Sequence, residues 1–369
     1  MRQTILKTML KTAMKTLAFA GLAVLAGCAA DQERVIHPTA AFSTQPPQVN
    51  QVEDAAFWIH PSDPQRSMLL VTNQWRGIEQ HGCDGMLLRT PPPPEAGNDF
   101  RGIDVLYDFP LTSGSVDLVF VGCKTTGNTG ETAGVQVWKV DPDARKCRPL
   151  MNSEVLRVLD GQRPLGVWTA RDPASGRRYL FVTIKHGRIE QYEIKPAADD
   201  RVSLTLVRTL EHDEVKAGVA DNAHGVFYFA NEEVGVFACP IDPAAGAGAA
   251  RQIIRIGEHG LTPDVGGLAI YPTADGGGYL IAVSQGERDS ASRFFIYRLT
   301  GSHDYVATLM PTGGDATYNS SGIAATSRPF GRAFPAGALA LKNRLNPNAS
   351  EDFNVYDWRA IQQQLDALR

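Results

Sequence analysis

Short apolar runs, each followed by turn-forming residues, repeat along most of the 369-residue chain. Six units share one order: a short apolar strand, a turn rich in Gly, Pro or Asp, a stronger apolar strand, a loop and an alternating strand. The units begin at Asp54, Gly102, Gly166, Gly218, Gly267 and Gly322. Because period-two alternation is typical of strands, and helical periodicity is confined to the residues from Tyr356 onward, the pattern predicts an all-β chain with one terminal helix.

The unit starts recur at intervals of roughly 45 to 65 residues, which is the period of four-stranded propeller blades. Such sheets cannot bury both faces alone, so they pack radially and close into a ring without exposed edges. A two-sheet sandwich is the weaker alternative, since sandwiches show no long internal period. We therefore expect one six-bladed β-propeller domain over residues 51–369.

The N-terminal region has the pattern of an export signal. Basic residues without an acid precede an apolar run at residues 17–26, and Cys28 directly follows Leu-Ala-Gly. The run is shorter than the roughly 18 residues that a membrane-spanning helix needs. We predict a lipoprotein signal peptide at residues 1–27, a lipid anchor at Cys28, a tether at residues 28–50, and export to the outer membrane, as Ala29 indicates. The alternative is an ordinary secretory signal in which Cys28 is incidental.

Charge narrows the class of partner. Removal of residues 1–27 takes away four basic residues, so 36 basic against 40 acidic residues become 32 against 40, a net charge near −8. Nucleic acid is therefore a poor partner, because its binding depends on neutralisation of phosphates by basic residues.

Cysteine usage is compatible with an exported protein. The cysteines after Cys28 are Cys83, Cys123, Cys147 and Cys239. No two of them have the spacing of a structural zinc site. Three pairings are open, and Cys123 with Cys147, the closest two in sequence, is the first candidate for a disulfide.

Carboxylates recur just before or within the first strand of several units. They are Glu53, Asp54, Asp104, Asp221 and Asp264, with Glu232 and Glu233 after a second strand. For a single residue such as Asp264, the ordinary interpretation is turn chemistry, in which the side chain bonds its own backbone. In a propeller the first strand of each blade lines the central channel, so these acids are expected at one opening. Converging carboxylates repel unless a cation neutralises them, and oxygen ligands of this kind suit calcium.

Longer patterns resemble a known family. They include VEDAAFWIHPSDPQRSMLLVTN, GIDVLYDFPL, GRRYLFVTIKHGRIEQYEI and HGLTPDVGGLAIYPTADGGGYLIAVSQG. From Val52 to Ile361 the chain is similar, in the same order, to the β-propeller phytases, calcium-dependent secreted enzymes that remove phosphates from inositol hexakisphosphate. The resemblance implies calcium ions at one end of the channel of a six-bladed propeller. It also implies metal-assisted hydrolysis of a small-molecule phosphomonoester, and we expect the chain to act as a monomer.

The resemblance assigns roles to particular residues. The metal ligands that it implies are Glu53, Asp54, Asp104, Glu232 and Asp264. The catalytic residues that it implies are Glu232, Lys185 and Asp264, and the phosphate-binding residues are Lys124, Lys185 and Arg188. Lys124 lies near the position of a family arginine, and it keeps the charge without the bidentate fork.

Several family positions carry different residues in this chain. Acids are replaced at His186, Arg188, Ala217, Asn231, Gly266, Asn319, Ser321 and Ala324, a lysine pair at Gln74 and Trp75, and a tyrosine at Leu165. Each lost carboxylate lowers the ligand charge, so fewer calcium ions should be held. Three interpretations stay open: a calcium-dependent phosphomonoesterase, a catalytically degraded binding module, and an enzyme for substrates with fewer phosphates, bound by Lys185, His186 and Arg188.

Overall fold

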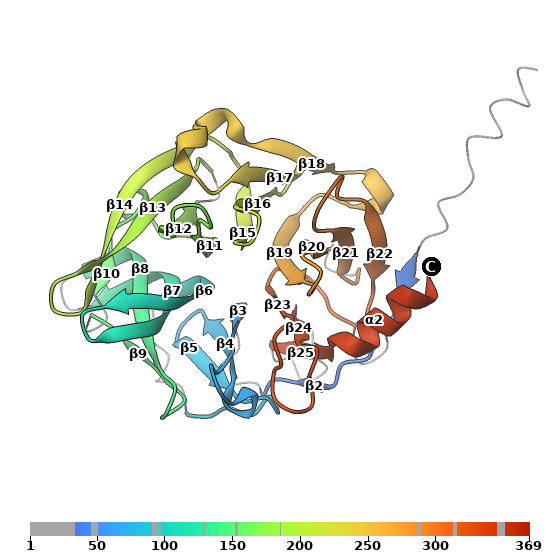
Figure 1. Cartoon of the computed structure of the whole chain (residues 1–369), viewed down its shortest axis with the longest axis horizontal. Helices are drawn as coiled ribbons and strands as arrows, with labels where there is room; N and C mark the ends of the chain where they lie inside the picture. Colours follow the sequence, from blue (N-terminus) through green and yellow to red (C-terminus); the bar gives the residue numbers. More distant parts are fainter. Residues whose placement is uncertain are drawn as a thin grey trace, which may run out of the picture. The chain divides into compact units, whose positions relative to one another are not determined.

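The computed structural model describes residues 34–45, 51–90, 95, 97–127, 130–151, 154–184, 186–286, 290–312, 316–344 and 351–369. The residues Val35–Arg369 form a compact unit, the second of the two into which the chain divides. The predicted signal peptide, Cys28 and Lys185 lie outside the described residues. The second unit consists of six sheets arranged in a ring (Figure 1), which is the architecture of a six-bladed β-propeller. The predicted fold is therefore confirmed.

The first three blades follow the predicted strand order. The first blade contains β3 (Val52–Trp58), β4 (Met68–Asn73) and β5 (Gly77–His81). The second contains β6 (Asp99–Leu111), β7 (Gly114–Gly127) and β8 (Gly130–Asp141), with β9 (Lys146–Pro149) and β10 (Val155–Leu156) both paired to β8. The third contains β11 (Val167–Arg171), β12 (Arg178–Thr183), β13 (Ile189–Ala197) and β14 (Arg201–Leu210).

The remaining blades repeat this arrangement. The fourth contains β15 (Val215–Asp221), β16 (Val226–Asn231), β17 (Gly235–Pro240) and β18 (Arg251–Arg255). The fifth contains β19 (Val265–Pro272), β20 (Gly278–Ser284), β21 (Arg293–Arg298) and β22 (Tyr305–Leu309), and the sixth contains β23 (Ile323–Thr326), β24 (Ala338–Asn343) and β25 (Asp352–Asp357). Short 3-10 turns occupy Pro64–Arg66, Leu159–Gly161, Pro243–Ala245, Ala247–Ala249 and Glu258–Gly260.

Two short strands near the N-terminus complete the outer edges of the last two blades. β1 (Val35–Ile36) runs parallel to β22, and β2 (Phe42–Ser43) runs antiparallel to β25. These residues fall within the segment 28–50 that was predicted to be a tether, so this part of the segment belongs to the sheets instead. A strand of two residues is too short to show the alternation by which strands are recognised in a sequence.

Neighbouring inner strands approach each other closely at the glycines that begin the repeats. A Cβ atom at Gly267 would lie 2.3 Å from the Ser321 carbonyl oxygen, and one at Gly322 would lie 2.4 Å from the Glu53 carbonyl oxygen. Such an approach is open only to glycine, because any side chain would collide with backbone. The repeat starts that were predicted from the sequence are therefore points at which blades contact one another around the channel.

One helix, α2 (Trp358–Ala367), follows the last strand, as predicted from the periodicity after Tyr356. The Asp357 side chain caps it by accepting a hydrogen bond from the Arg359 N–H. Trp358 is buried and stacks on Tyr271 of the fifth blade with 3.6 Å between ring centroids. Within the part of the chain that the structure describes, no helix has the length and apolar content that a membrane span requires.

The candidate disulfide between Cys123 and Cys147 is not formed. Both residues, like Cys83 and Cys239, are buried free cysteines. On strand β8, Cys123 lies opposite Gly134 and Cys147 lies opposite Val140, and these two partners are six residues apart. At the rise of a β-strand this separation is about 20 Å, far beyond the reach of a disulfide.

Candidate functional site

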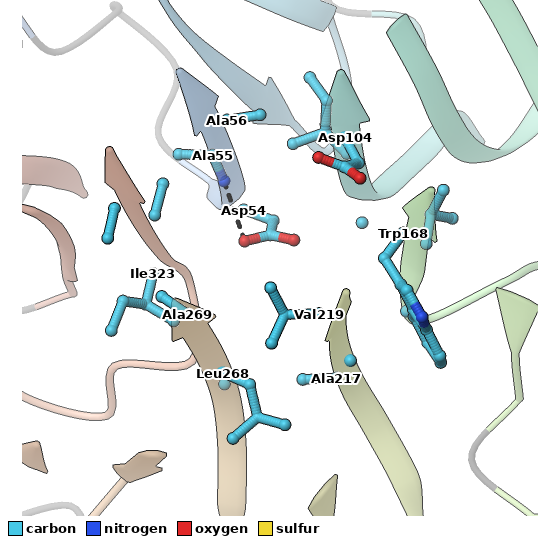
Figure 2. Close-up of a pocket in the computed structure, with 18 of the residues that line it drawn as sticks. Asp54, Ala55, Ala56, Asp104, Trp168, Ala217, Val219, Leu268, Ala269 and Ile323 are labelled. Carbon is cyan, nitrogen blue, oxygen red and sulfur yellow. Dashed lines mark hydrogen bonds between the residues drawn. The ribbon is translucent and has the colours of Figure 1, made fainter. Parts of the chain in front are cut away.

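A cavity of about 290 Å³ follows the axis of the ring and is lined by the inner strands of all six blades. Most of its wall consists of small or aliphatic side chains such as Ala217, Val219, Leu268 and Ala269 (Figure 2). The charged residues in the lining are Glu53, Asp54, Arg101, Asp104, Lys216 and Arg328. Charged groups inside a protein channel interact more strongly than they do at an open surface.

Several of these charges belong to residues near the start of an inner strand. Glu53, Arg101 and Lys216 are all within the first three residues of their inner strands. The starts of neighbouring inner strands lie against each other, since a Cβ atom at Gly166 would be 2.5 Å from the Lys216 carbonyl oxygen. We call the end at which the inner strands begin the mouth. Of these three residues, Glu53 is one of the predicted carboxylates, whereas Arg101 and Lys216 are basic residues that the sequence analysis did not name.

Asp54 and Asp104 project into the cavity itself (Figure 2). The Ala55 N–H donates to Asp54 Oδ1 at 2.9 Å, and the Thr169 N–H and hydroxyl both donate to Asp104 Oδ2 at 2.7 Å. Burial, and to a smaller extent the neighbouring Asp104 charge, raise the pKa of Asp54 to about 7. Burial also raises the pKa of Asp104, against the effect of the Thr169 hydrogen bonds.

Glu53 belongs to a network of ion pairs at the mouth. Arg101 Nη1 lies 2.5 Å and Lys342 Nζ lies 3.4 Å from its carboxylate oxygens. The Arg101 Nε also donates to Asp99 at 2.8 Å, and Asp99 in turn contacts Arg163. The Glu53 carboxylate is therefore neutralised by basic side chains of the second and sixth blades.

Glu232 and Asp264 share a different cation. Lys216 Nζ lies 3.0 Å from Glu232 Oε1 and 3.9 Å from Asp264 Oδ1. The Asp264 N–H donates to the Glu232 carbonyl oxygen at 2.8 Å, so the two acids are also joined through the backbone. Asp264 has a left-handed φ of 69°, a conformation that Asp tolerates better than most residues. Asp264 therefore lies in a turn, as its sequence context indicated, and it also lies beside Glu232.

Asp221 is not at the mouth. It ends β15 rather than beginning it, so it lies at the opposite end of the inner strand. Its carboxylate accepts from the Ala223 N–H at 3.1 Å and lies 2.6 Å from His224 Nδ1. This is the local turn chemistry that was the ordinary alternative for an acid beside a strand.

Two of the predicted phosphate-binding residues already form ion pairs with acidic side chains. Arg188 lies 2.6 Å from Asp160 and 2.7 Å from Glu190, so its guanidinium group is held in two ion pairs. Lys124 lies opposite Asp99 in the β6–β7 register and 3.3 Å from Glu131. Lys185 is outside the described residues. Of the two described candidates, Lys124 is the one whose register places it beside the charged network of the mouth.

The predicted calcium cluster requires five carboxylates to converge: Glu53, Asp54, Asp104, Glu232 and Asp264. Calcium takes six to eight oxygen ligands. Three of the five already have a basic side chain within 3.9 Å. Among the described residues, no three of the five bring their ligand oxygens within 4.8 Å of one another. A shared calcium cluster therefore does not fit these side chains as they lie.

Over the same described residues, one group of three side chains has ligand atoms within 4.8 Å of one another: His186, Asp213 and Glu214. His186 Nδ1 lies 2.7 Å from Glu214 Oε1 and 3.8 Å from Asp213 Oδ1. The group does not line the cavity, and the His186 side chain is 70% exposed. His186 was predicted to bind substrate phosphate, but its side chain contacts two carboxylates instead.

The sequence interpretation missed the basic residues of the mouth, Arg101, Lys216 and Lys342. Arg101 directly precedes the repeat start GIDV, and Lys216 lies two residues before the repeat start at Gly218. A basic residue one or two positions before the repeat start in two of the repeats was the available signal. Lys342 is on β24, and no local pattern indicated that ring closure would bring it to Glu53 of the first blade.

Comparisons with known proteins agree with the resemblance. The chain is 28% identical over 323 residues to the 3-phytase of Bacillus subtilis (strain 168), which covers 85% of this chain and 81% of that protein. Among solved structures, the Malassezia sympodialis allergen Mala s 1 aligns with a TM-score of 0.49 at 12% identity, over 83% of this chain and 91% of that one. A chain of the nidogen/laminin complex aligns with a TM-score of 0.43 at 12% identity, over 78% and 96% respectively.

The sequence profile described as Phytase matches residues 3–368, which is almost the whole chain. The match includes all six blades and every residue of the mouth. The chain therefore belongs to the phytase family.

Proposed function

We propose that the chain is a phosphomonoesterase that hydrolyses phosphate groups of inositol hexakisphosphate or of a related small phosphate ester at the mouth of the channel. The observation that supports it most directly is the presence of Arg101 and Lys216 in the lining of the same cavity as Asp54 and Asp104. Basic groups bind a phosphate ester, and carboxylates beside it can exchange protons with water and leaving group.

Arg101 is the residue that we assign to phosphate binding at the mouth. Its guanidinium group now bridges Glu53 and Asp99 at 2.5 and 2.8 Å. The same planar donors match two oxygens of a phosphate group, and a doubly charged phosphate competes well with a single carboxylate. Lys216 and Lys124 would contribute point charges to neighbouring phosphates of a polyphosphorylated substrate.

Asp54 and Asp104 are the carboxylates that we assign to proton transfer. Within the described residues, they are the two acids of the cavity lining with no lysine or arginine within ion-pair distance. An acid without a basic partner is free to take a proton from an attacking water. The roles of Glu232, Asp264 and Lys185 in catalysis rest on the family resemblance.

The test is release of inorganic phosphate from inositol hexakisphosphate and from simple phosphomonoesters, at micromolar protein. One arm contains millimolar calcium and the other contains EDTA. We expect release in at least one arm. Calcium dependence is a separate proposal that rests on the family resemblance alone, and equal rates in the two arms would exclude it. Absence of release in both arms, from a folded protein, would overturn the phosphomonoesterase.

A second candidate is a binding module without turnover. The ion pairs at Glu53, Glu232 and Arg188 favour it, because each one neutralises a charge that hydrolysis was expected to use. Calorimetric binding of inositol hexakisphosphate without phosphate release would support this candidate. Absence of both binding and release would exclude it together with the enzyme.

We also propose that the protein is an exported lipoprotein anchored at Cys28, on the basis of the residues 1–28 pattern. Labelling with a fatty-acid analogue and fractionation of membranes test this proposal. Loss of the label in Cys28→Ser, with the protein then in the soluble fraction, is the expected result. A labelled Cys28→Ser variant would contradict it.

A further inference from the structure

Lys216 is positioned between two acids of adjacent blades. Its Nζ lies 3.0 Å from Glu232 Oε1, 3.9 Å from Asp264 Oδ1 and 3.1 Å from the Gln285 side-chain oxygen. The Glu232 side chain is only 6% exposed, whereas that of Lys216 is 33% exposed. The ammonium group therefore has at least three oxygen neighbours, which come from the fourth and fifth blades.

The backbone fixes the two acids near each other whether or not a cation is present. Asp264 follows the end of the fourth blade, and its N–H donates to the Glu232 carbonyl oxygen at 2.8 Å. The Val265 N–H is directed at the same carbonyl oxygen at 3.4 Å. Two carboxylates held in this way repel each other, and one of them is buried, so the fold needs a positive charge between them.

We infer that the Lys216 ammonium group is a built-in counter-ion that takes the place of a shared divalent cation at Glu232 and Asp264. A calcium ion at these carboxylates would lie beside an ammonium group that already uses the same oxygens, and like charges at that separation exclude each other. The native protein therefore holds no calcium between Glu232 and Asp264, and its charge balance on this side of the mouth is independent of metal. The inference concerns metal binding and does not rest on the proposed function.

Calcium titration by calorimetry tests this inference with variants that change only the charge at residue 216. Lys216→Gln removes the charge but keeps a polar side chain, and we expect it to bind one more calcium equivalent than the native protein, or to bind calcium at least tenfold more tightly. Lys216→Arg keeps the charge, and its calcium binding should equal that of the native protein. Lys195→Gln is the matched control, because it breaks the Lys195–Glu193 pair of 2.9 Å on β13, away from the mouth.

The extra calcium must depend on the acids. In the double variant Lys216→Gln/Glu232→Gln it should be lost, and if it persists, the inference is overturned. A folded Lys216→Gln variant that gains no calcium would also overturn it. Should Lys216→Gln fail to fold, Glu232→Gln in the native background decides the question: unchanged calcium stoichiometry supports the inference, and loss of one calcium equivalent contradicts it.

Discussion

The ammonium group of Lys216 lies 3.0 Å from the buried carboxylate of Glu232, so the positive charge on this side of the channel mouth is part of the chain itself. Arg101 has the same relationship to Glu53, because its Nη1 lies 2.5 Å from a Glu53 carboxylate oxygen. The two acids of the cavity interior, Asp54 and Asp104, differ from this pattern because their contacts are hydrogen bonds from backbone and hydroxyl donors. The mouth thus combines neutralised acids at its edge with proton-binding acids inside it.

Replacement of Arg101 should weaken substrate binding. We expect Arg101→Ala to lower kcat/KM for inositol hexakisphosphate by about 10- to 100-fold, mainly through KM, because a charged bidentate contact contributes about 1.4–2.7 kcal/mol. Arg101→Lys should recover only part of the loss, since the planar fork is absent. Steady-state phosphate release measures the effect. Arg148→Ala is the control, because Arg148 pairs with Asp141 at 3.6 Å on the outer part of the second blade. An unchanged KM in Arg101→Ala would contradict the assignment.

Stability should depend on pH through Asp54. Its pKa is raised from 3.8 to about 7, so the fold favours the protonated acid. Stability is therefore highest below the unfolded-state pKa and falls as the pH rises from about 4 to about 7. Asp54→Asn cannot ionise, and we expect it to exceed the native protein at pH 8 by on the order of 2–4 kcal/mol and to match it near pH 4. Denaturant unfolding in EDTA at the two pH values measures this. Equal stabilities at pH 8 would show that the charge carries no penalty.

The contact between the fifth and sixth inner strands should tolerate no side chain at Gly267. A Cβ atom there would meet the Ser321 carbonyl oxygen at 2.3 Å and Ile323 Cγ2 at 2.9 Å. We expect Gly267→Ala to lower the free energy of unfolding by about 3 kcal/mol. Gly248→Ala, where a Cβ atom has nothing within 4 Å, should change it by less than about 0.5 kcal/mol. Similar unfolding midpoints for the two variants would show that the strands can separate without cost.

The N-terminal edge strand should contribute to stability. Ile36 of β1 is 2% exposed and packs in the core cluster of the fifth and sixth blades. Ile36→Ala should lower the free energy of unfolding by about 2–4 kcal/mol, as for other large-to-small core substitutions. Val234, which is 43% exposed, provides the control, and Val234→Ala should have an effect below about 0.5 kcal/mol. Equal effects in urea titrations would mean that β1 is not packed on the ring.

The cysteines should be unreactive in the folded protein. Burial raises the pKa of Cys123 and of Cys147 to about 12, so neither provides a thiolate at ordinary pH. In a Cys28→Ser background, a thiol reagent at pH 8 should modify none of the four in the native state and all four after unfolding. A reducing agent should leave the Tm unchanged. Fewer than four thiols in the unfolded chain would reveal a disulfide.

The fold could be predicted from the sequence because every blade repeats one strand pattern, and because the repeat starts at Gly267 and Gly322 are glycines for a steric reason. The outer strands β1 and β2 could not be predicted in this way. Each has two residues, and β1 pairs with Thr308 and Leu309, near the other end of the chain. Periodicity is a local signal, whereas this pairing exists only after the ring has closed.

The candidate site was predicted in part. Glu53 and Asp54 lie near the start of their inner strand, as the sequence position indicated, whereas Asp221 ends its strand and lies at the opposite end. The sequence position did not indicate what neutralises Glu53, because Lys342 reaches this carboxylate only when the sixth blade meets the first. Arg188 shows the same limit, as its partner Asp160 comes from the segment before β11. Charge partners depend on tertiary neighbours, and these are not visible in a single motif.

The position of β1 determines how the propeller would respond to mechanical load. Val35 enters the ring on the outermost strand of the fifth blade, and two residues pair there with β22. A pull on the preceding chain is therefore applied first to the short β1–β22 pairing at the circumference of the ring. The strand carrying the cavity wall in that blade is separated from the pull by β20, β21 and β22. In the fifth blade, a load on the N-terminal side would thus reach the outer strands before the strand that lines the channel.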